Sequence, residues 1–245
     1  MDSGTDRWID AGGTRLQVRT WGEDAGRNAL YWHGVGLTSR GSANLGEAAP
    51  QLVREHRLRV VALDAPGFGR SPALEPARYH PHALADLVPA LLDALELERA
   101  AFMGYSWGGD VGCRVAARHP DRVNALVLLD AGYRDPPFDP ALPYERYLVR
   151  NRELAARTEG VCVDPAVVAA VEHGIAQALP STTRGRLSLP VLLVADADTT
   201  EDDLASFRAD VPHAEVIRPR EPGHNVLLAG GAETVCAIGD WLEAR

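Results

Sequence analysis

Lysine is absent from this chain of 245 residues, and all 25 of its basic side chains are arginine. An enzyme that forms a Schiff base on a lysine, or that uses a Ser-Lys dyad, is therefore excluded. Acidic residues number 34, which gives a formal charge of -9. This balance argues against a nucleic-acid or anionic-membrane partner, because either would need a clustered basic face.

Cysteines and long apolar runs are also scarce. Cys113, Cys162 and Cys236 are odd in number, far apart and in no metal-ligand spacing, so we expect packed free thiols and no metal site. No window approaches the ~20 apolar residues of a membrane span, and the N-terminus has no apolar core typical of a signal sequence. We therefore expect a cytoplasmic monomer or homodimer that acts on a small molecule without a cofactor.

A glycine-rich turn at residues 100–119 is the most informative stretch that the sequence contains. An apolar run of strand length ends at Gly104, helical spacing begins at Trp107, and Ser106 lies in the connection, which reads GYSWG. Glycines two residues either side of the serine leave room for strand and helix to approach each other. Free N–H groups at the helix start would stabilise negative charge beside the serine. The pattern predicts a nucleophile elbow.

Apolar strands and helical segments alternate along the chain. The pair Gly12-Gly13 between two alternating runs indicates a hairpin at an antiparallel edge. Amphipathic spacing predicts a helix over 82–97, kinked at Pro89. Buried strands are expected over 29–32, 59–64, 100–104, 123–129, 190–195 and 214–218. This order predicts an α/β fold with a mostly parallel sheet of about eight strands, helices on both faces and ligands at the carboxyl ends of the strands.

Residues 133–188 are too long for a simple connection between two strands. We expect them to form a helical lid, with helices over 141–158 and 164–179, inserted between core segments 1–132 and 189–245.

The charge of this lid differs from that of the rest of the chain. The lid carries 7 arginines and 7 acidic residues, so the whole of the -9 belongs to the core. A neutral cover that bears Tyr144 and Tyr147 suits a small uncharged or aromatic substrate. Arg134 or Arg146 offers a partner for a substrate carboxylate, although solvated arginines are the commoner case.

A serine hydroxyl needs a base that takes its proton and a carboxylate that orients the base. His224, in the sequence EPGH between the last strand and the last helix, is the best candidate for the base. Asp198 leads for the carboxylate because it follows the strand that ends at 195, and Asp130, at the end of the strand over 123–129, is the alternative acid.

The oxyanion that forms during acyl transfer needs two backbone N–H donors. They are expected from Trp107, which follows the serine, and from Val35, in the loop after an earlier strand. Gly34 lets that loop approach closely, and we place Gly34 and Tyr105, with the two lid tyrosines, in the substrate site. His33 is expected to anchor the same loop, and the sequence PGFGRS after Asp64 to form turns.

The segments HGVGLTS, LDAPGFGRSP, GYSWGG, PVLLVADAD and PGH together resemble the α/β-hydrolase fold family, in its branch with a serine nucleophile and a short lid. The resemblance implies a hydrolase fold and activities that range from esterases, lipases and thioesterases to carbon-carbon bond hydrolases, prolyl aminopeptidases and haloperoxidases. The family's usual acid position falls on Asp198. Ala195 stands where a glycine is common, which keeps Asp130 open.

We therefore predict a carboxylesterase-like serine hydrolase that cleaves an ester, or a related acyl or carbon-carbon bond, through an acyl-enzyme. Two alternatives use the same pocket: a ligand-binding receptor that has kept the fold, and a non-hydrolytic acyltransferase or lyase. The residues do not specify the natural substrate.

Overall fold

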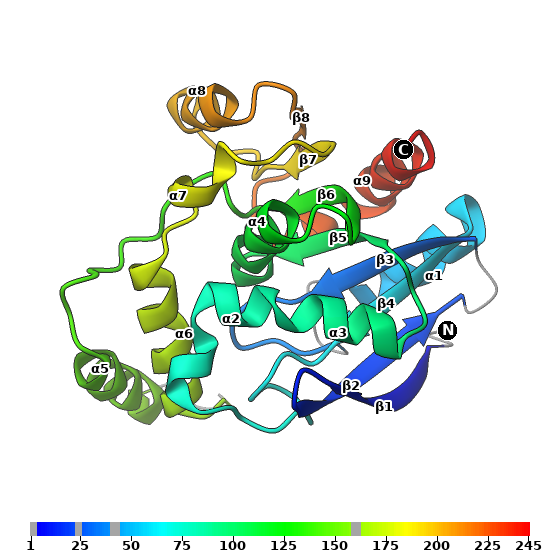
Figure 1. Ribbon diagram of the computed structural model, residues 1–245. Coiled ribbons are helices and arrows are strands. Elements are labelled where there is room, and N and C mark those ends of the chain that lie inside the picture. Colours follow the sequence, from blue (N-terminus) through cyan, green and yellow to red (C-terminus); the bar gives the residue numbers. More distant parts are fainter. Residues whose placement is uncertain (1–3, 23–25, 40–44, 158–162) are drawn as a thin grey trace.

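A mostly parallel sheet runs through the computed structural model, which describes residues 4–22, 26–39, 45–157 and 163–245 (Figure 1). The strands are β1 (Thr5–Ala11), β2 (Thr14–Trp21), β3 (Arg27–Trp32), β4 (Leu58–Leu63), β5 (Ala100–Tyr105), β6 (Val123–Leu129), β7 (Val191–Val194) and β8 (Glu215–Ile217). Their order in the sheet is β1-β2-β4-β3-β5-β6-β7-β8, in which the β1–β2 and β2–β4 pairs are antiparallel and the other pairs are parallel. The predicted fold class is confirmed.

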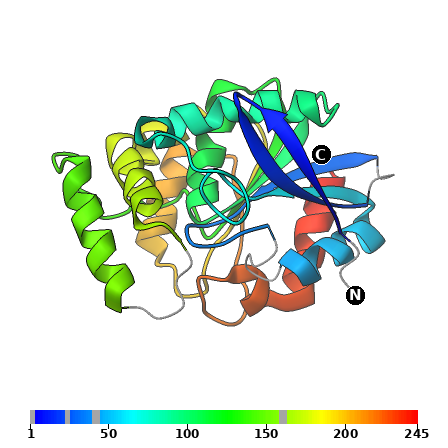
Figure 2. The same ribbon diagram turned by 90° about the horizontal axis from the view of Figure 1, so that it is seen from below.

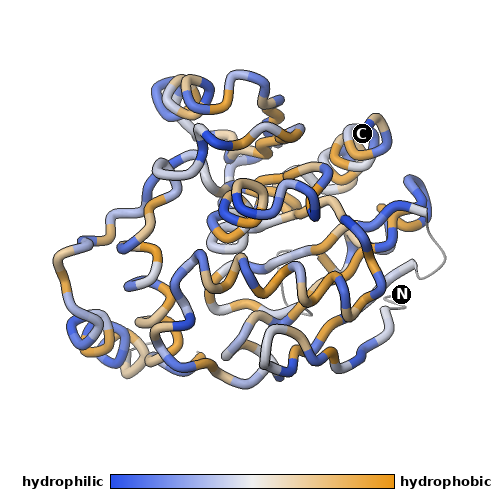
Figure 3. The backbone as a smooth tube through the Cα atoms, in the orientation of Figure 1, coloured by the Kyte–Doolittle hydropathy of each residue, from blue (hydrophilic) through white to orange (hydrophobic). Residues whose placement is uncertain are grey.

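Helices cover both faces of this sheet because its strands bury residues on both sides. The helices are α1 (Leu45–His56), α2 (Pro81–Ala85), α3 (Leu87–Ala94), α4 (Trp107–Arg118), α5 (Tyr144–Arg157), α6 (Pro165–Gln177), α7 (Ser181–Arg184), α8 (Glu201–Asp210) and α9 (Val226–Glu243), with a 3-10 turn at Pro76–Tyr79. Phe102 of β5 belongs to the hydrophobic cluster that includes residues of α3, α4 and α8, whereas its neighbour Met103 belongs to a second cluster with residues of α1 and α9. Figure 3 shows the hydrophobic residues along the central strands.

The helix expected over 82–97 is divided into α2 and α3. The break falls at Asp86, one turn before Pro89, and not at the proline itself. Proline has no N–H to donate to the carbonyl four residues earlier, which belongs to Ala85 at the end of α2. The predicted kink is therefore displaced by about one turn.

The segment between β6 and β7 contains the two predicted helices, α5 and α6. It also contains the short α7, which the sequence did not predict. Figures 1 and 2 place α5 at the opposite end of the molecule from the β1–β2 hairpin. Helix α6 is fixed to the core, since a Cβ on Gly174 would lie only 2.5 Å from the carbonyl oxygen of Tyr79. The division into a core and a separate lid stays a prediction.

Two further expectations concern thiols and membranes. Cys113 is buried and Cys236 is partly buried, both as free thiols, while Cys162 lies outside the described residues. Within the described ranges, each helix is too short or too polar to cross a bilayer.

Strand β5 and helix α4 approach each other so closely that side chains cannot be accommodated between them. A Cβ on Gly104 would lie 2.4 Å from the carbonyl oxygen of Gly108, and a Cβ on Gly108 would lie 2.1 Å from that of Trp32. Both distances are far below van der Waals contact, and the atoms met are rigid backbone. The glycines of the predicted elbow are thus required by packing.

Replacing Gly104 with alanine should therefore force the backbones of β5 and α4 apart. We expect Gly104→Ala to lower the free energy of unfolding, measured by urea titration, by about 3 kcal/mol. Gly46→Ala in α1 is the control, because a Cβ there meets nothing within 4 Å. Its stability should equal or slightly exceed that of the wild type. Equal stability of the Gly104 variant and the wild type would show that the packing argument is wrong.

Candidate active site

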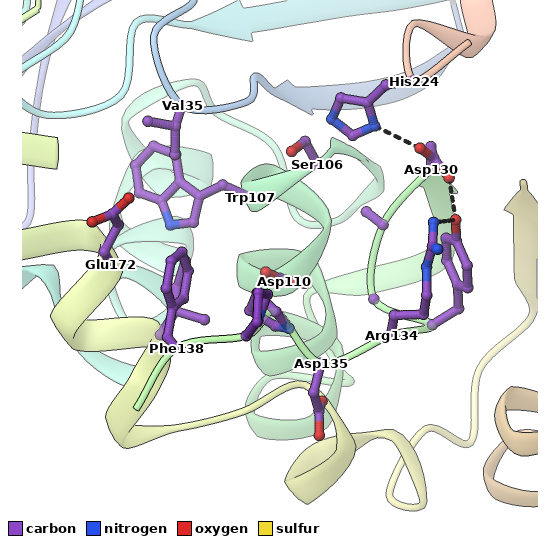
Figure 4. A pocket seen from close by; sticks show the side chains of 16 residues that line it. Val35, Ser106, Trp107, Asp110, Asp130, Arg134, Asp135, Phe138, Glu172 and His224 are labelled. Carbon is purple, nitrogen blue, oxygen red and sulfur yellow. Dashed lines mark hydrogen bonds and ion pairs between the residues drawn. The ribbon is translucent and has the colours of Figure 1, made fainter. Parts of the chain in front are cut away.

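A pocket of about 460 Å³ lies at the carboxyl ends of the central strands (Figure 4). Five segments that are distant in sequence line it: Val35 in the loop after β3; Ser106, Trp107 and Asp110 at the start of α4; residues 130–138 after β6; Glu172 and Ile175 on α6; and His224 in the loop after β8. Carboxyl ends of parallel strands are where this class of fold binds ligands.

Ser106 occupies the turn between β5 and α4 in a strained conformation. Its φ of 52° and ψ of -121° lie in a region of backbone conformation that residues other than glycine rarely adopt. The turn is held in place by the backbone, because the N–H of Ser106 donates to the carbonyl of Leu129 at 3.1 Å and its carbonyl accepts from Gly109 at 2.9 Å. The hydroxyl is thereby presented to the pocket, as an elbow requires.

His224 is oriented by Asp130, which comes from the end of β6. Its Nδ1 lies 2.5 Å from Oδ2 of Asp130, and its ring packs on that of Tyr105 with a centroid distance of 4.9 Å. Figure 4 shows the other ring nitrogen turned toward Ser106. The serine, the imidazole and the carboxylate therefore come together in one pocket.

The side chain of Asp130 is only 4% exposed, yet it is well supplied with hydrogen-bond donors. Its Oδ1 accepts from the hydroxyl of Tyr133 at 2.5 Å and from the N–H of Asp196 at 3.3 Å. Burial by itself raises the pKa of Asp130, but the hydrogen bonds from His224 and Tyr133 outweigh burial, so the net pKa is lowered. Asp130 is consequently an anion near neutral pH.

Asp198, the leading candidate for this carboxylate, is not in that position. It is exposed in the loop after β7, where its N–H donates to Oδ1 of Asp196 at 3.2 Å. The carboxylate that reaches His224 comes from the end of β6, which is next to β5 in the sheet, and not from the loop after β7. The expectation for Asp198 is not met, and the alternative, Asp130, makes the contact with His224.

Tyr133 was missed by sequence reasoning although it supports the acid directly. Burial, and next the hydrogen bond to Asp130, raise the pKa of Tyr133 to about 12, so its hydroxyl stays protonated and donates to the carboxylate. Arg134 in turn donates to the tyrosine oxygen at 2.6 Å and lies 3.7 Å from Asp203. The position of Tyr133, four residues beyond the end of a strand next to the elbow, was the available signal.

The loop expected to supply an oxyanion donor lies beside the elbow. A Cβ on Gly34 would come within 3.1 Å of the Tyr105 ring and 3.2 Å of Cβ of Ser106, so the close approach is real. Val35 and Trp107 line the pocket together with Ser106. As the first residue of α4, Trp107 has a backbone N–H that no earlier turn of the helix can satisfy. The role of both residues as oxyanion donors stays a prediction.

His33 anchors this loop through two hydrogen bonds, as the sequence indicated. Its Nδ1 donates to the carbonyl of Gly34 at 2.7 Å, and its Nε2 accepts from the N–H of Ala65 at 2.9 Å. Asp64 accepts from the N–H groups of Ser39 at 2.7 Å and Arg70 at 3.0 Å. The residues around PGFGRS are therefore turn architecture.

The two tyrosines placed in the substrate site do not line the pocket. The hydroxyl of Tyr144 donates to the carbonyl of Ala166, and that of Tyr147 to the carbonyl of Asp139, so both hold the inserted segment together. Tyr105 also lies outside the lining and packs on His224 instead. Other side chains of the inserted segment, among them Phe138, Glu172 and Ile175, face the pocket.

Among the described residues, the side chains able to gather around a metal ion lie at the junction of α1 and α9, away from the pocket. His56 lies near Asp240 and Glu243, with its Nδ1 3.7 Å and 3.4 Å from their carboxylates, and near Glu55 and Cys236. Exposed carboxylates often gather in this way without an ion.

Known proteins agree with this architecture. Residues 30–158, more than half of the chain, match the family model described as the alpha/beta hydrolase fold. The chain belongs to this alpha/beta hydrolase family. It is 37% identical to 2-hydroxymuconate semialdehyde hydrolase of Pseudomonas sp. (strain CF600) over 123 residues, 50% of this chain and 42% of that protein. The chain spans less than half the length of the first curated relatives that it matches.

Two solved structures of the alpha/beta hydrolase family share the fold over nearly their whole length. One is the enol-lactonase from Burkholderia xenovorans LB400, with a TM-score of 0.78, 22% identity and coverage of 96% of this chain and 99% of that one. The other is a hydrolase from Pseudomonas aeruginosa PA01, with a TM-score of 0.79, 22% identity and coverage of 98% and 99%. At this level of identity the likeness shows the fold alone.

The burial of His33 predicts that the stability of the protein depends on pH. Loss of hydration lowers the pKa of His33 from 6.5 to about 4. Because the folded pKa is the lower one, the neutral ring stabilises the fold above pH 6.5, and this contribution is lost as the pH falls toward 4. The difference between the two pKa values corresponds to roughly 3 kcal/mol in the free energy of unfolding.

A His33→Gln variant lacks this titration. We expect the stability advantage of the wild type over the variant, measured by urea titration, to shrink by roughly 3 kcal/mol between pH 7 and pH 4. The same substitution at the exposed His213 is the control. If the stability gap for His33→Gln does not change with pH, the imidazole is not held neutral by burial.

Proposed function

We propose that the protein is a serine hydrolase of small molecules that cleaves an ester, or a related acyl or carbon-carbon bond, through an acyl-enzyme. One observation carries the proposal: His224 is hydrogen-bonded to the buried Asp130 in the pocket where the strained Ser106 is presented. A base held by a buried anion next to a serine on an elbow is the arrangement that makes an alcohol nucleophilic.

The first half of the reaction forms the acyl-enzyme. The free ring nitrogen of His224 takes the proton of Ser106 as the serine oxygen attacks the substrate carbonyl, and Asp130 stabilises the resulting imidazolium. Backbone N–H groups of Val35 and Trp107 hold the oxyanion. His224 then gives the proton to the leaving group, whose bond to the carbonyl carbon breaks.

Water completes the cycle. His224 removes a proton from a water molecule as its oxygen attacks the acyl carbon, and returns the proton to the oxygen of Ser106 when the acid leaves. Water therefore supplies one oxygen atom to the product. In heavy-oxygen water a hydrolase incorporates the label into the acid, whereas an acyltransferase, a lyase or a ligand-binding receptor does not, and this distinguishes the alternative functions.

The place of the protein in the cell and its assembly remain proposals. We propose a cytoplasmic monomer or homodimer, supported by the acidic composition and by the absence of a bilayer-crossing helix from the described residues. Fractionation of the expressing cell and light scattering of the purified protein measure both properties.

Substitution of the two candidate acids tests the triad. We expect Asp130→Asn to reduce kcat for a p-nitrophenyl ester by about a thousandfold to ten thousandfold, because the amide leaves the imidazole of His224 in the wrong tautomer. Asp198→Asn is the matched control and should stay within about twofold of the wild type, since Asp198 is exposed and bonded only within its own loop.

Ser106→Ala should abolish formation of the acyl-enzyme, which labelling of the wild type by a fluorophosphonate reports directly. Full ester hydrolysis by Ser106→Ala would remove the proposed mechanism. A large loss in Asp198→Asn combined with normal activity in Asp130→Asn would reassign the acid.

A further inference from the structure

Asp110 is a pocket residue that the proposed mechanism does not use. It stands in the first turn of α4, four residues after Ser106, and is only 8% exposed although it lines the pocket. Four residues of helix advance the chain by about 6 Å. Figure 4 shows Asp110 further along α4 than Ser106. Its carboxyl group thus faces whatever part of a substrate lies about one helical turn from the reacting carbonyl.

Other carboxylates of the pocket are already engaged by donors of the protein. Glu172 accepts from the amide of Asn151 at 2.6 Å and lies 3.7 Å from Arg150. Asp135 accepts from both the N–H and the hydroxyl of Ser181, at 2.8 and 2.5 Å. Asp130 is bound to His224. Each of these three carboxylates therefore already has a side-chain partner within the protein.

Asp110 differs because, within the described part of the chain, no side chain donates a hydrogen bond to its carboxylate, whose partner is the backbone N–H of Gly132. An ionised carboxylate can accept about four. The neighbouring Arg114 does not supply the rest, because it is fully buried and donates instead to the backbone carbonyls of Asp110, at 3.0 Å, and Ala178. Acceptor capacity in a buried position is therefore left for a ligand.

The electrostatics of the pocket indicate the sign of that ligand. Asp110, Asp130, Asp135 and Glu172 face the pocket with one guanidinium, that of Arg134, which is already bonded to Tyr133. Burial raises the pKa of Asp110 to about 7, and Asp135 adds to this while Arg114 opposes it. A cation beside the carboxylate would offset the cost of burial, whereas an anion would add to it.

We propose that Asp110 is a specificity-determining residue that binds a positively charged amine of the substrate, about one helical turn from the carbonyl that Ser106 attacks. The aromatic residues Trp107 and Phe138 line the same pocket, and the Phe138 ring already has the guanidinium of Arg150 over it, 5.9 Å from its centroid. The pocket consequently selects against substrates that carry a carboxylate at this position. This inference rests on the proposed hydrolase function and assigns its substrate class.

Three p-nitrophenyl esters test the proposal, with straight acyl chains of equal length that end in an ammonium, a methyl or a carboxylate group. We expect the wild type to show the highest kcat/KM for the ammonium ester and the lowest for the carboxylate ester. Asp110→Asn keeps the shape but removes the charge. This variant should lower kcat/KM for the ammonium ester by about 30-fold and raise kcat/KM for the carboxylate ester. Its kcat/KM for the methyl ester should stay within about threefold of the wild-type value.

Asp202→Asn is the matched control, because it removes the same charge from an exposed position on α8 outside the pocket. It should leave the order of the three esters unchanged. Equal loss on all three esters in Asp110→Asn, or a wild type that prefers the carboxylate or the methyl ester, would overturn the proposal. If Asp110→Asn does not fold by circular dichroism, the wild-type order decides alone.

Binding separates a failure of this inference from a failure of the hydrolase proposal. If the wild type hydrolyses none of the esters, calorimetric titration with an alkylammonium and with an alkyl carboxylate of equal length decides the assignment of Asp110. Tighter binding of the ammonium, lost in Asp110→Asn, supports it. Equal or tighter binding of the carboxylate refutes it. The hydrolase proposal itself fails only if the fluorophosphonate also leaves Ser106 unlabelled.

Discussion

The hydrogen bond between Asp130 and His224 is the interaction on which the site depends, because it joins two segments 94 residues apart. A buried carboxylate is costly unless donors surround it, and here the hydroxyl of Tyr133 and the N–H of Asp196 complete the shell. The N–H donor comes from the loop after β7 and the hydroxyl from the segment after β6. The fold therefore uses three loops at one edge of the sheet to hold a single negative charge beside the base.

The loops after β6 and β7 both contact the segment that carries His224, but in different ways. Since β6 neighbours β5, a residue at its end lies close to the elbow, and Asp130 adopts a positive φ of 44° there. The loop after β7, which carries Asp198, has a different task. Its Asp196 accepts from the N–H of Gly223 at 2.9 Å and so fixes the backbone next to His224. The loop after β7 positions the base through a backbone contact, and the neighbouring strand supplies the orienting charge.

Local sequence pattern was enough to predict the alternating strands, the elbow and the identity of the base, because each depends on a short run of residues. Buried strands are continuous apolar runs, and Gly104 and Gly108 mark a packing constraint within one turn of chain. Which of the two candidate carboxylates contacts His224 depends instead on how loops distant in sequence meet in space, which no local pattern contains. The pocket-facing side chains of the inserted segment were missed for the same reason: Tyr144 and Tyr147 bond to their own segment, whereas Phe138 faces the pocket.

Arg184 connects the short helix α7 to the backbone that follows β6, at the edge of the sheet where the pocket lies. Arg184 of α7 is buried and donates to the carbonyls of Gly132 at 3.2 Å and Tyr133 at 2.6 Å, while it pairs with Asp210 of α8 at 3.0 Å. One planar guanidinium can serve two carbonyls and a carboxylate at once, which a compact ammonium does poorly. The backbone that carries Tyr133, and with it the donor to Asp130, is thus held from the inserted segment. The buried Arg184 therefore joins α7 and α8 to the segment after β6 that carries Asp130 and Tyr133.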